Sequence, residues 1–161
     1  MALWKTGNYE ARVLCSFVDD PAKVTPAQMD RWVSAFDNWA YCDALCFNLF
    51  DRTPHAFGRV HAWAASRKEF IRRTAFALLW SLALHDRTSA DAPFARCLPL
   101  IESAATDDRN FVKKAVVMAL KAVGRRSTGL NAAYVALATR LAVSADPTAR
   151  WIGRNALKDL R

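Results

Sequence analysis

The sequence predicts an all-α protein in which helical hairpins stack into an α-solenoid with a basic concave face. Hydrophobic residues make up 53% of the 161 residues, and the chain has only 5 Gly and 6 Pro. This composition favours close-packed helices, because the residues that break helices are scarce. A motif that contains basic residues also recurs at intervals of about 40 residues. The length suits one compact core, and we expect residues 1–161 to form a single domain.

Capping residues mark where the first helices begin and end. Asn8 is expected to cap a helix that Asp19-Asp20-Pro21 stops, since the residue before a proline avoids the helical region. Thr25-Pro26 combines a favoured N-cap with a proline at the first helical position, which predicts a second start. Asp37-Asn38 is expected to break or cap the chain before a helix that begins at Trp39.

Similar signals divide the rest of the chain. Thr53-Pro54 is expected to start a helix through His61 and Trp63, and Ser66 a helix over Arg67–His85. Ala92-Pro93 is expected to start a helix through Ile101, and Asp107 a helix over Arg109–Val123. Another helix is expected through Tyr134 and Leu141, and Asp146-Pro147 is expected to start the last one. Gly124 is expected to end the helix over 109–123.

Three of the expected helices carry the same aromatic–aliphatic–x–basic pattern. It begins at Phe70, Phe111 and Trp151, so the copies are 41 and 40 residues apart. HEAT and armadillo helical repeats have periods in this range. Stacked hairpins of this kind bury a continuous core and curve into a concave surface. We therefore expect HEAT-like repeats in which the equivalent helix of each unit faces the concavity.

The formal charge of +8 is unevenly distributed, because residues 1–50 are slightly acidic and residues 51–161 carry the whole positive excess. The repeat pattern predicts a ladder of Arg73, Lys114 and Arg154 on the concave face. Further basic residues are expected to support this ladder in binding nucleic acid: Arg72, Lys113, Arg125, Arg126 and Arg150. The alternative is that these side chains only form a solvated face or cap the ends of helices.

Several classes of protein are disfavoured. No apolar run approaches the ~20 residues that span a bilayer, and the N-terminus lacks the apolar core of a signal peptide. The four cysteines form no CxxC pair, and the three histidines form no HExxH motif. We expect no metal, no cofactor and no membrane segment, and a cytoplasmic location.

The most informative stretch is Arg31–Phe50, which is rich in apolar and aromatic residues but includes Asp43. On a helix, Trp39 and Asp43 are four residues apart and share a face. A carboxylate on an apolar helix must be paired, protonated or used, because burying a bare charge is costly. Asp43 is therefore either a structural partner of an arginine on a neighbouring helix or, with Trp39, part of a cleft for a cationic substrate.

Taken together, the motifs resemble those of the AlkD-like DNA alkylation repair family, whose members are DNA glycosylases built from HEAT-like repeats. The resemblance covers most of the chain in order and is carried by Leu3-Trp4-x-x-Gly7-x-x-Glu10-Ala11-Arg12, Asp19-Asp20-Pro21, Val24-Thr25, Gln28-Met29-x-x-Trp32, Asn38-Trp39-x-x-x-Asp43, Ile71-Arg72-Arg73-Thr74-Ala75 and Phe111-Val112-Lys113-Lys114-Ala115.

This resemblance implies excision of cationic purines, such as 3-methyladenine and 7-methylguanine, from double-stranded DNA, without a metal or cofactor. Trp39 would then be an aromatic wall at the lesion, Asp43 the catalytic carboxylate and Arg73 the arginine that contacts DNA. A fixed carboxylate can stabilise the positive charge that develops on the sugar as the glycosidic bond breaks. A monomer is expected, associated with the nucleoid if the host cell is bacterial.

The sequence departs from the family pattern at two points. Met118 lies where the family usually has a second aromatic residue, so we expect it to form one wall of the lesion pocket without a π-face. An N-terminal helical segment of the family is also expected to be missing. Two alternatives therefore stay open: a catalytically silent protein that binds damaged or unusual DNA, and a scaffold for protein interactions.

Overall fold

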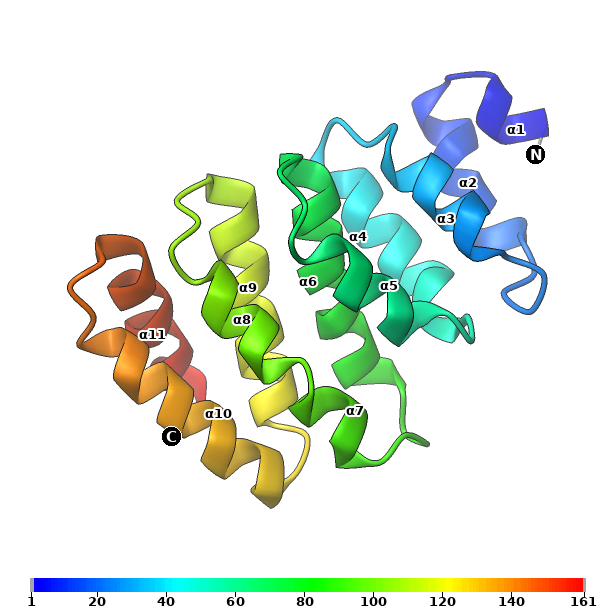
Figure 1. Cartoon of the computed structure of the whole chain (residues 1–161). Helices are drawn as coiled ribbons and strands as arrows, with labels where there is room; N and C mark the ends of the chain where they lie inside the picture. Colours follow the sequence, from blue (N-terminus) through cyan, green and yellow to red (C-terminus); the bar gives the residue numbers. More distant parts are fainter. Residues whose placement is uncertain (1, 161) are drawn as a thin grey trace.

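The computed structural model describes residues 2–160, and every regular element among them is helical (Figure 1). The elements are α1 (Ala2–Lys5), α2 (Tyr9–Val18), α3 (Pro26–Val33), α4 (Trp39–Asn48), the 3-10 turn η1 (Phe50–Arg52), α5 (Ala56–Trp63), α6 (Glu69–His85), α7 (Asp91–Ala95), α8 (Leu98–Ala104), α9 (Asn110–Gly124), α10 (Thr128–Ala142) and α11 (Pro147–Leu160). The all-α prediction is confirmed.

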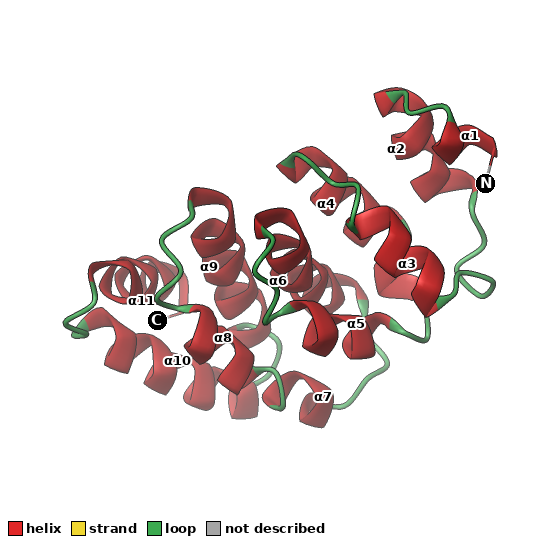
Figure 2. Cartoon of the chain, turned by 45° about the horizontal axis from the view of Figure 1, so that its top comes forward, coloured by secondary structure: helices red, strands yellow, loops and turns green. Residues whose placement is uncertain are grey.

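The helices form two stacked layers. Successive helices follow an arc, and the two termini lie at its opposite ends (Figure 1, Figure 2). One layer contains α4, α6, α9 and α11, which pack side by side in that order. The other layer covers it: α5 packs on α6, α8 on α9, and α10 on both α9 and α11. Each hairpin buries its apolar face against its neighbours, as expected for a solenoid of HEAT-like repeats.

Several predicted helix starts are confirmed at the level of single hydrogen bonds. The side chain of Asn8 accepts from the Ala11 amide (3.0 Å), and Thr25 accepts from the Gln28 amide (3.2 Å). Asn38 caps α4 by accepting from the amides of Ala40 and Tyr41. Each cap satisfies an amide that has no partner within its helix.

Two other predicted starts are wrong because the capping side chain is used elsewhere. The hydroxyl of Thr53 donates to the Phe50 carbonyl (2.8 Å) and closes η1, so α5 begins only at Ala56. The hydroxyl of Ser66 accepts from the Lys68 amide (3.2 Å), and α6 begins at Glu69 rather than Arg67. Both side chains do form local hydrogen bonds, but these bonds stabilise the turn before the helix and not its first turn.

The single helix predicted from Ala92-Pro93 through Ile101 is two helices, α7 and α8. Pro99, in the first turn of α8, has no N–H for the carbonyl four residues earlier, which interrupts the helix. The helix predicted from Arg109 begins one residue later, and Gly124 is its last residue rather than the one after it. The short α1 is not predicted at all.

No helix among residues 2–160 is both long and apolar enough to cross a membrane.

Candidate functional site

A pocket of about 580 Å³ opens on the layer formed by α4, α6, α9 and α11. Its lining residues are Trp39, Asp43, Arg73, Trp80, Phe111, Lys114, Ala115, Val117, Met118, Lys121, Trp151 and Asn155. Each helix contributes residues that are four or seven positions apart and therefore share one helical face. Four segments that are distant in the sequence thus meet at one site, which we call the central pocket.

Asp43 and Arg73 form the polar centre of this pocket. Arg73 donates to both oxygens of the Asp43 carboxylate, at 2.7 and 2.9 Å. Its other terminal nitrogen donates to the Phe111 carbonyl at 3.0 Å, so one guanidinium joins α4, α6 and α9. The Arg73 side chain is only 8% exposed, whereas that of Asp43 is 24% exposed. The carboxylate is therefore fixed from behind and reachable from the pocket.

Burial raises the pKa of Asp43, and the charge and hydrogen bonds of Arg73 oppose that rise without cancelling it. Removal from water destabilises the ionised carboxylate, while the arginine beside it stabilises that form. Asp43 thus combines the two arrangements considered for it: it is the ion-pair partner of an arginine on a neighbouring helix, and it lines a cleft.

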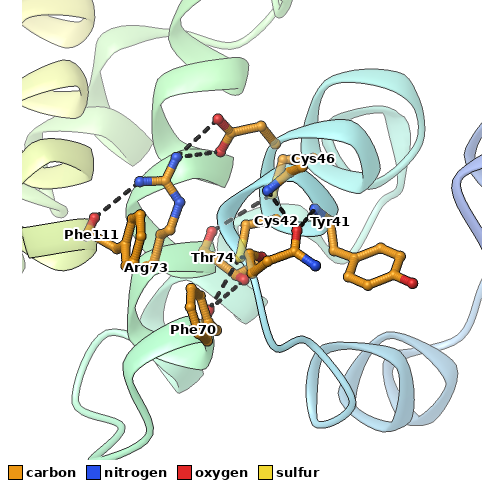
Figure 3. Close-up of polar contacts among 10 residues, drawn as sticks. Tyr41, Cys42, Cys46, Phe70, Arg73, Thr74 and Phe111 are labelled. Carbon is orange, nitrogen blue, oxygen red and sulfur yellow. Dashed lines mark hydrogen bonds and ion pairs between the residues drawn. The ribbon is translucent and has the colours of Figure 1, made fainter. Parts of the chain in front are cut away.

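Two buried thiols attach α4 to α6 behind the carboxylate. Cys42 donates to the Phe70 carbonyl (3.6 Å) and Cys46 to the Thr74 carbonyl (3.7 Å), as Figure 3 shows. Burial raises the pKa of Cys42 to about 11, so its thiol stays protonated and is a poor nucleophile. These cysteines therefore help to hold α4, the helix that carries Asp43, against α6.

Indole rings from three helices line the central pocket. Trp39 on α4 is 52% exposed and Trp151 on α11 is 39% exposed. Trp80 on α6 is half-buried and packs edge-on against Phe47, with ring centroids 4.7 Å apart. Such faces can hold an apolar sugar surface or a cationic group by contact with the π-system.

The predicted ladder divides between two places. Arg73 and Lys114 both line the central pocket, Arg73 buried and paired, Lys114 exposed. Arg154 does not line the central pocket but a separate groove along α11. Met118 lies in the pocket wall, where the sequence places it.

The five supporting basic residues all have neighbours within the protein. Arg72 pairs with the buried Asp107 (2.8 Å), and Arg125 donates to the Asp159 carbonyl (2.9 Å). Lys113 lies over the Trp151 ring, 5.4 Å from its centroid.

Arg126 and Arg150 bind carbonyls next to helix ends. Arg126 donates to the carbonyls of Asp86 and Ser89, and Arg150 to that of Ser144 (2.6 Å). This is the helix-end arrangement that sequence analysis leaves open as the alternative to DNA contact.

The pocket also has residues that sequence analysis does not select: Phe111, Trp80, Lys121, Trp151 and Asn155. A signal for most of them is present in the spacing. Trp80 follows Arg73 by seven residues, Lys121 follows Lys114 by seven, and Asn155 follows Trp151 by four. Within residues 2–160, no three His, Cys, Asp or Glu side chains are grouped so that they could hold a metal ion.

Comparison with known proteins assigns the chain to a family. A family model described as DNA alkylation repair enzyme matches residues 1–160. The chain belongs to this DNA alkylation repair family. A solved structure also resembles it with a TM-score of 0.75 and 18% identity, over 98% of this chain and 72% of the other. That structure is described as a new family of proteins related to the HEAT-like repeat DNA glycosylases, with affinity for branched DNA structures. No curated protein matches the sequence.

The likeness in structure confirms the fold of HEAT-like helical repeats. The family match confirms the resemblance that the motifs indicate.

Proposed function

We propose that the protein is a DNA glycosylase that removes cationic N-alkylated purines, such as 3-methyladenine and 7-methylguanine, from double-stranded DNA. The observation that carries this proposal is the arrangement of Asp43. Its carboxylate is reachable from the central pocket, is held by Arg73 and lies on the helical face of an exposed indole, Trp39. Membership of the DNA alkylation repair family supports the same reaction class.

The reaction requires little from the protein beyond a positioned charge. An N-alkylated purine is already cationic, so the bond to C1′ breaks with its electron pair passing to the base nitrogen. The base then leaves neutral, and positive charge develops on the sugar. Asp43 stabilises that charge, and water adds to C1′ and loses a proton.

Arg73 and Trp39 have positioning roles in this proposal. Arg73 fixes both oxygens of Asp43, so the carboxylate does not have to reorganise during the reaction. Trp39 is the aromatic wall for the sugar and the lesion, with Met118 on the α9 side of the pocket. Lys114 is exposed at the same pocket, where it can neutralise a phosphate.

A second function is favoured by two observations. The positive charge of Arg73 lies against both carboxylate oxygens and offsets the negative charge that would stabilise a cationic sugar, and the α9 wall offers the thioether of Met118 instead of a ring. In addition, the similar solved structure is described as having affinity for branched DNA. The alternative is therefore a protein that binds unusual DNA structures without excising a base.

A cleavage assay separates the two functions. The protein is incubated with a duplex that carries 7-methylguanine, abasic sites are cleaved with alkali, and DNA binding is measured by fluorescence anisotropy. Asp43→Asn keeps the shape of the side chain but removes the charge. The glycosylase proposal expects strand cleavage by the wild type, none by Asp43→Asn, and similar DNA binding by both.

The matched control is Asp20→Asn, the same change at an exposed carboxylate that is not part of the central pocket. This control should cleave like the wild type. DNA binding by all three proteins without any cleavage would support the silent DNA-binding protein instead.

A further inference from the structure

A second groove runs along α11 next to the central pocket. Its volume is about 420 Å³, and the described residues that line it are Pro147, Arg150, Trp151, Arg154, Asn155 and Lys158. We call it the α11 groove. Trp151 and Asn155 line both this groove and the central pocket, so the two sites are neighbours on one helix.

The charge of the α11 groove has one sign. Arg150, Arg154 and Lys158 follow one another at intervals of four residues and form a stripe in which neighbours are about 6 Å apart along the helix axis. Among residues 2–160, no carboxylate lines the groove. The single acidic residue of α11, Asp159, instead pairs with Lys121 of α9 (2.6 Å).

Two of these cations have no partner among residues 2–160. Arg154 and Lys158 are exposed, and their side chains make neither a hydrogen bond nor an ion pair there. Like charges four residues apart on a helix repel each other, so the stripe costs the free protein stability. An anion that bridges neighbouring cations would relieve this repulsion.

The groove also contains an aromatic face. Trp151 is 39% exposed and lies beside the stripe. A basic track with an exposed aromatic ring is the combination that binds single-stranded nucleic acid, since phosphates contact the cations and a base stacks on the ring. A polar outer face on a terminal repeat explains exposed charge, but it explains neither the single sign nor the indole.

We propose that the α11 groove binds a single-stranded segment of nucleic acid that continues from the duplex at the central pocket. Arg154 and Lys158 contact its phosphates, Arg150 supports them, and Trp151 lies where the strand passes from one site to the other. This inference rests on the proposed DNA binding and extends it, because it assigns a second site and a preference for duplexes with a single-stranded tail.

The test compares four probes by fluorescence anisotropy over a range of salt concentrations: a blunt duplex, the same duplex with a 5′ single-stranded tail, the same duplex with a 3′ tail, and the tail strand alone. We expect the wild-type protein to bind one of the tailed duplexes about tenfold more tightly than the blunt duplex at low salt. The plot of log affinity against log salt should be steeper by roughly 2 for that tailed duplex, as expected for about three extra phosphates on a single strand.

The double variant Arg154→Ala/Lys158→Ala should lose this preference and the extra salt dependence. Arg52→Ala/Arg87→Ala removes the same charge from two exposed arginines on another part of the surface and should keep both properties. All four side chains are exposed, so thermal unfolding should be nearly unchanged in either variant.

Equal binding of blunt and tailed duplexes by the wild type, or an unchanged preference in Arg154→Ala/Lys158→Ala, would overturn the second site while leaving duplex binding in place. Binding of the tail strand alone, lost in the same variant, together with no binding of the blunt duplex, would keep the α11 groove and overturn the proposed function. Binding of none of the probes would overturn both.

Discussion

Asp43 is held by Arg73, whose side chain is more deeply buried than that of Asp43. The Arg73 guanidinium donates on two sides, to Asp43 and to the Phe111 carbonyl, while its Nε is buried without a partner among residues 2–160. Loss of the arginine would leave a carboxylate that burial already disfavours.

Arg73→Ala should therefore lower the free energy of unfolding by about 3 kcal/mol, the low end for breaking a buried pair. It should also raise the pKa of Asp43 further, because the charge that opposes the effect of burial is gone. Thermal unfolding at pH 7 and at pH 5 measures both, and the loss should be smaller at pH 5, where Asp43 is more readily protonated. Lys114→Ala, at an exposed lysine of the same pocket, should leave stability nearly unchanged. Equal stability of Arg73→Ala and the wild type would contradict the structural part of this account.

Asp107 provides a pH-dependent contrast. Hydrogen bonds from the Arg109 side chain, with further help from the Arg109 amide and from the charges of Arg109 and Arg72, hold the pKa of Asp107 below its usual value. Burial acts in the opposite direction and is outweighed. A carboxyl with a lowered pKa in the folded state stabilises the protein above the pKa of the unfolded chain, about 3.9, and loses this effect as the pH falls through the folded value.

Asp107→Asn should accordingly reduce the melting temperature clearly at pH 7, with a difference that shrinks below about pH 4 as the wild-type carboxyl is protonated. Melting curves of both proteins between pH 3 and pH 7 measure this difference. A gap that is constant over this range would mean that the charge of Asp107 contributes nothing.

At the scale of the helices, α10 and α11 approach so closely that only glycine fits at their crossing. A Cβ atom at Gly153 would lie 2.3 Å from the Ala142 nitrogen and 2.5 Å from the Ala138 carbonyl oxygen. Both are backbone atoms, so the helices would have to move apart.

Gly153→Ala is expected to destabilise the protein by about 2 kcal/mol or more through this overlap, although alanine is the better helix former. Gly58→Ala, within α5, introduces the same methyl group where no atom lies within 4 Å. This control should stabilise the protein by about 0.5–1 kcal/mol. Chemical denaturation measures both changes, and a stabilising Gly153→Ala would contradict the packing of α10 on α11.

The pairing of α9 with α11 also affects the charge available to DNA. Lys121 pairs with Asp159 at 2.6 Å and Arg125 with the same carboxylate at 3.5 Å, although Lys121 lines the central pocket. Asp159→Asn should therefore free Lys121 from its ion pair and raise DNA affinity, with a salt dependence steeper by roughly 1 for one added phosphate contact. Arg125 keeps its hydrogen bond to the backbone carbonyl of residue 159. Glu102→Gln is the charge-matched control, because it removes one negative charge from the exposed ion pair of Glu102 with Arg140. Unchanged binding by Asp159→Asn would show that Lys121 does not contact phosphate.

Helix boundaries could be predicted where the capping side chain bonds within its own first turn, as Asn8, Thr25 and Asn38 do. They could not be predicted where turn or tertiary contacts compete for that side chain. Thr53 is used by η1, and the Asp107 carboxylate is used by Arg72 and Arg109. Spacing alone does not reveal these distant partners.

Over the whole molecule, the repeat pattern and the family resemblance predict the architecture, because a period of about 40 residues requires hairpins that bury their faces against each other. They also place Trp39, Asp43, Arg73 and Met118, which the structure brings together in the central pocket. The flank on which each basic side chain lies could not be predicted. The repeat pattern aligns Arg154 with Arg73 and Lys114, yet Arg154 lines the α11 groove and not the central pocket.

The most direct test of the central claim is a single-turnover rate constant. Base excision from a 7-methylguanine duplex is measured with enough protein to bind all the DNA, so that differences in affinity do not affect the rate. If Asp43 stabilises the developing charge on the sugar, Asp43→Asn should excise at least about 100-fold more slowly than the wild type while binding the same duplex equally well. Equal rate constants for the two proteins would contradict the catalytic role of Asp43.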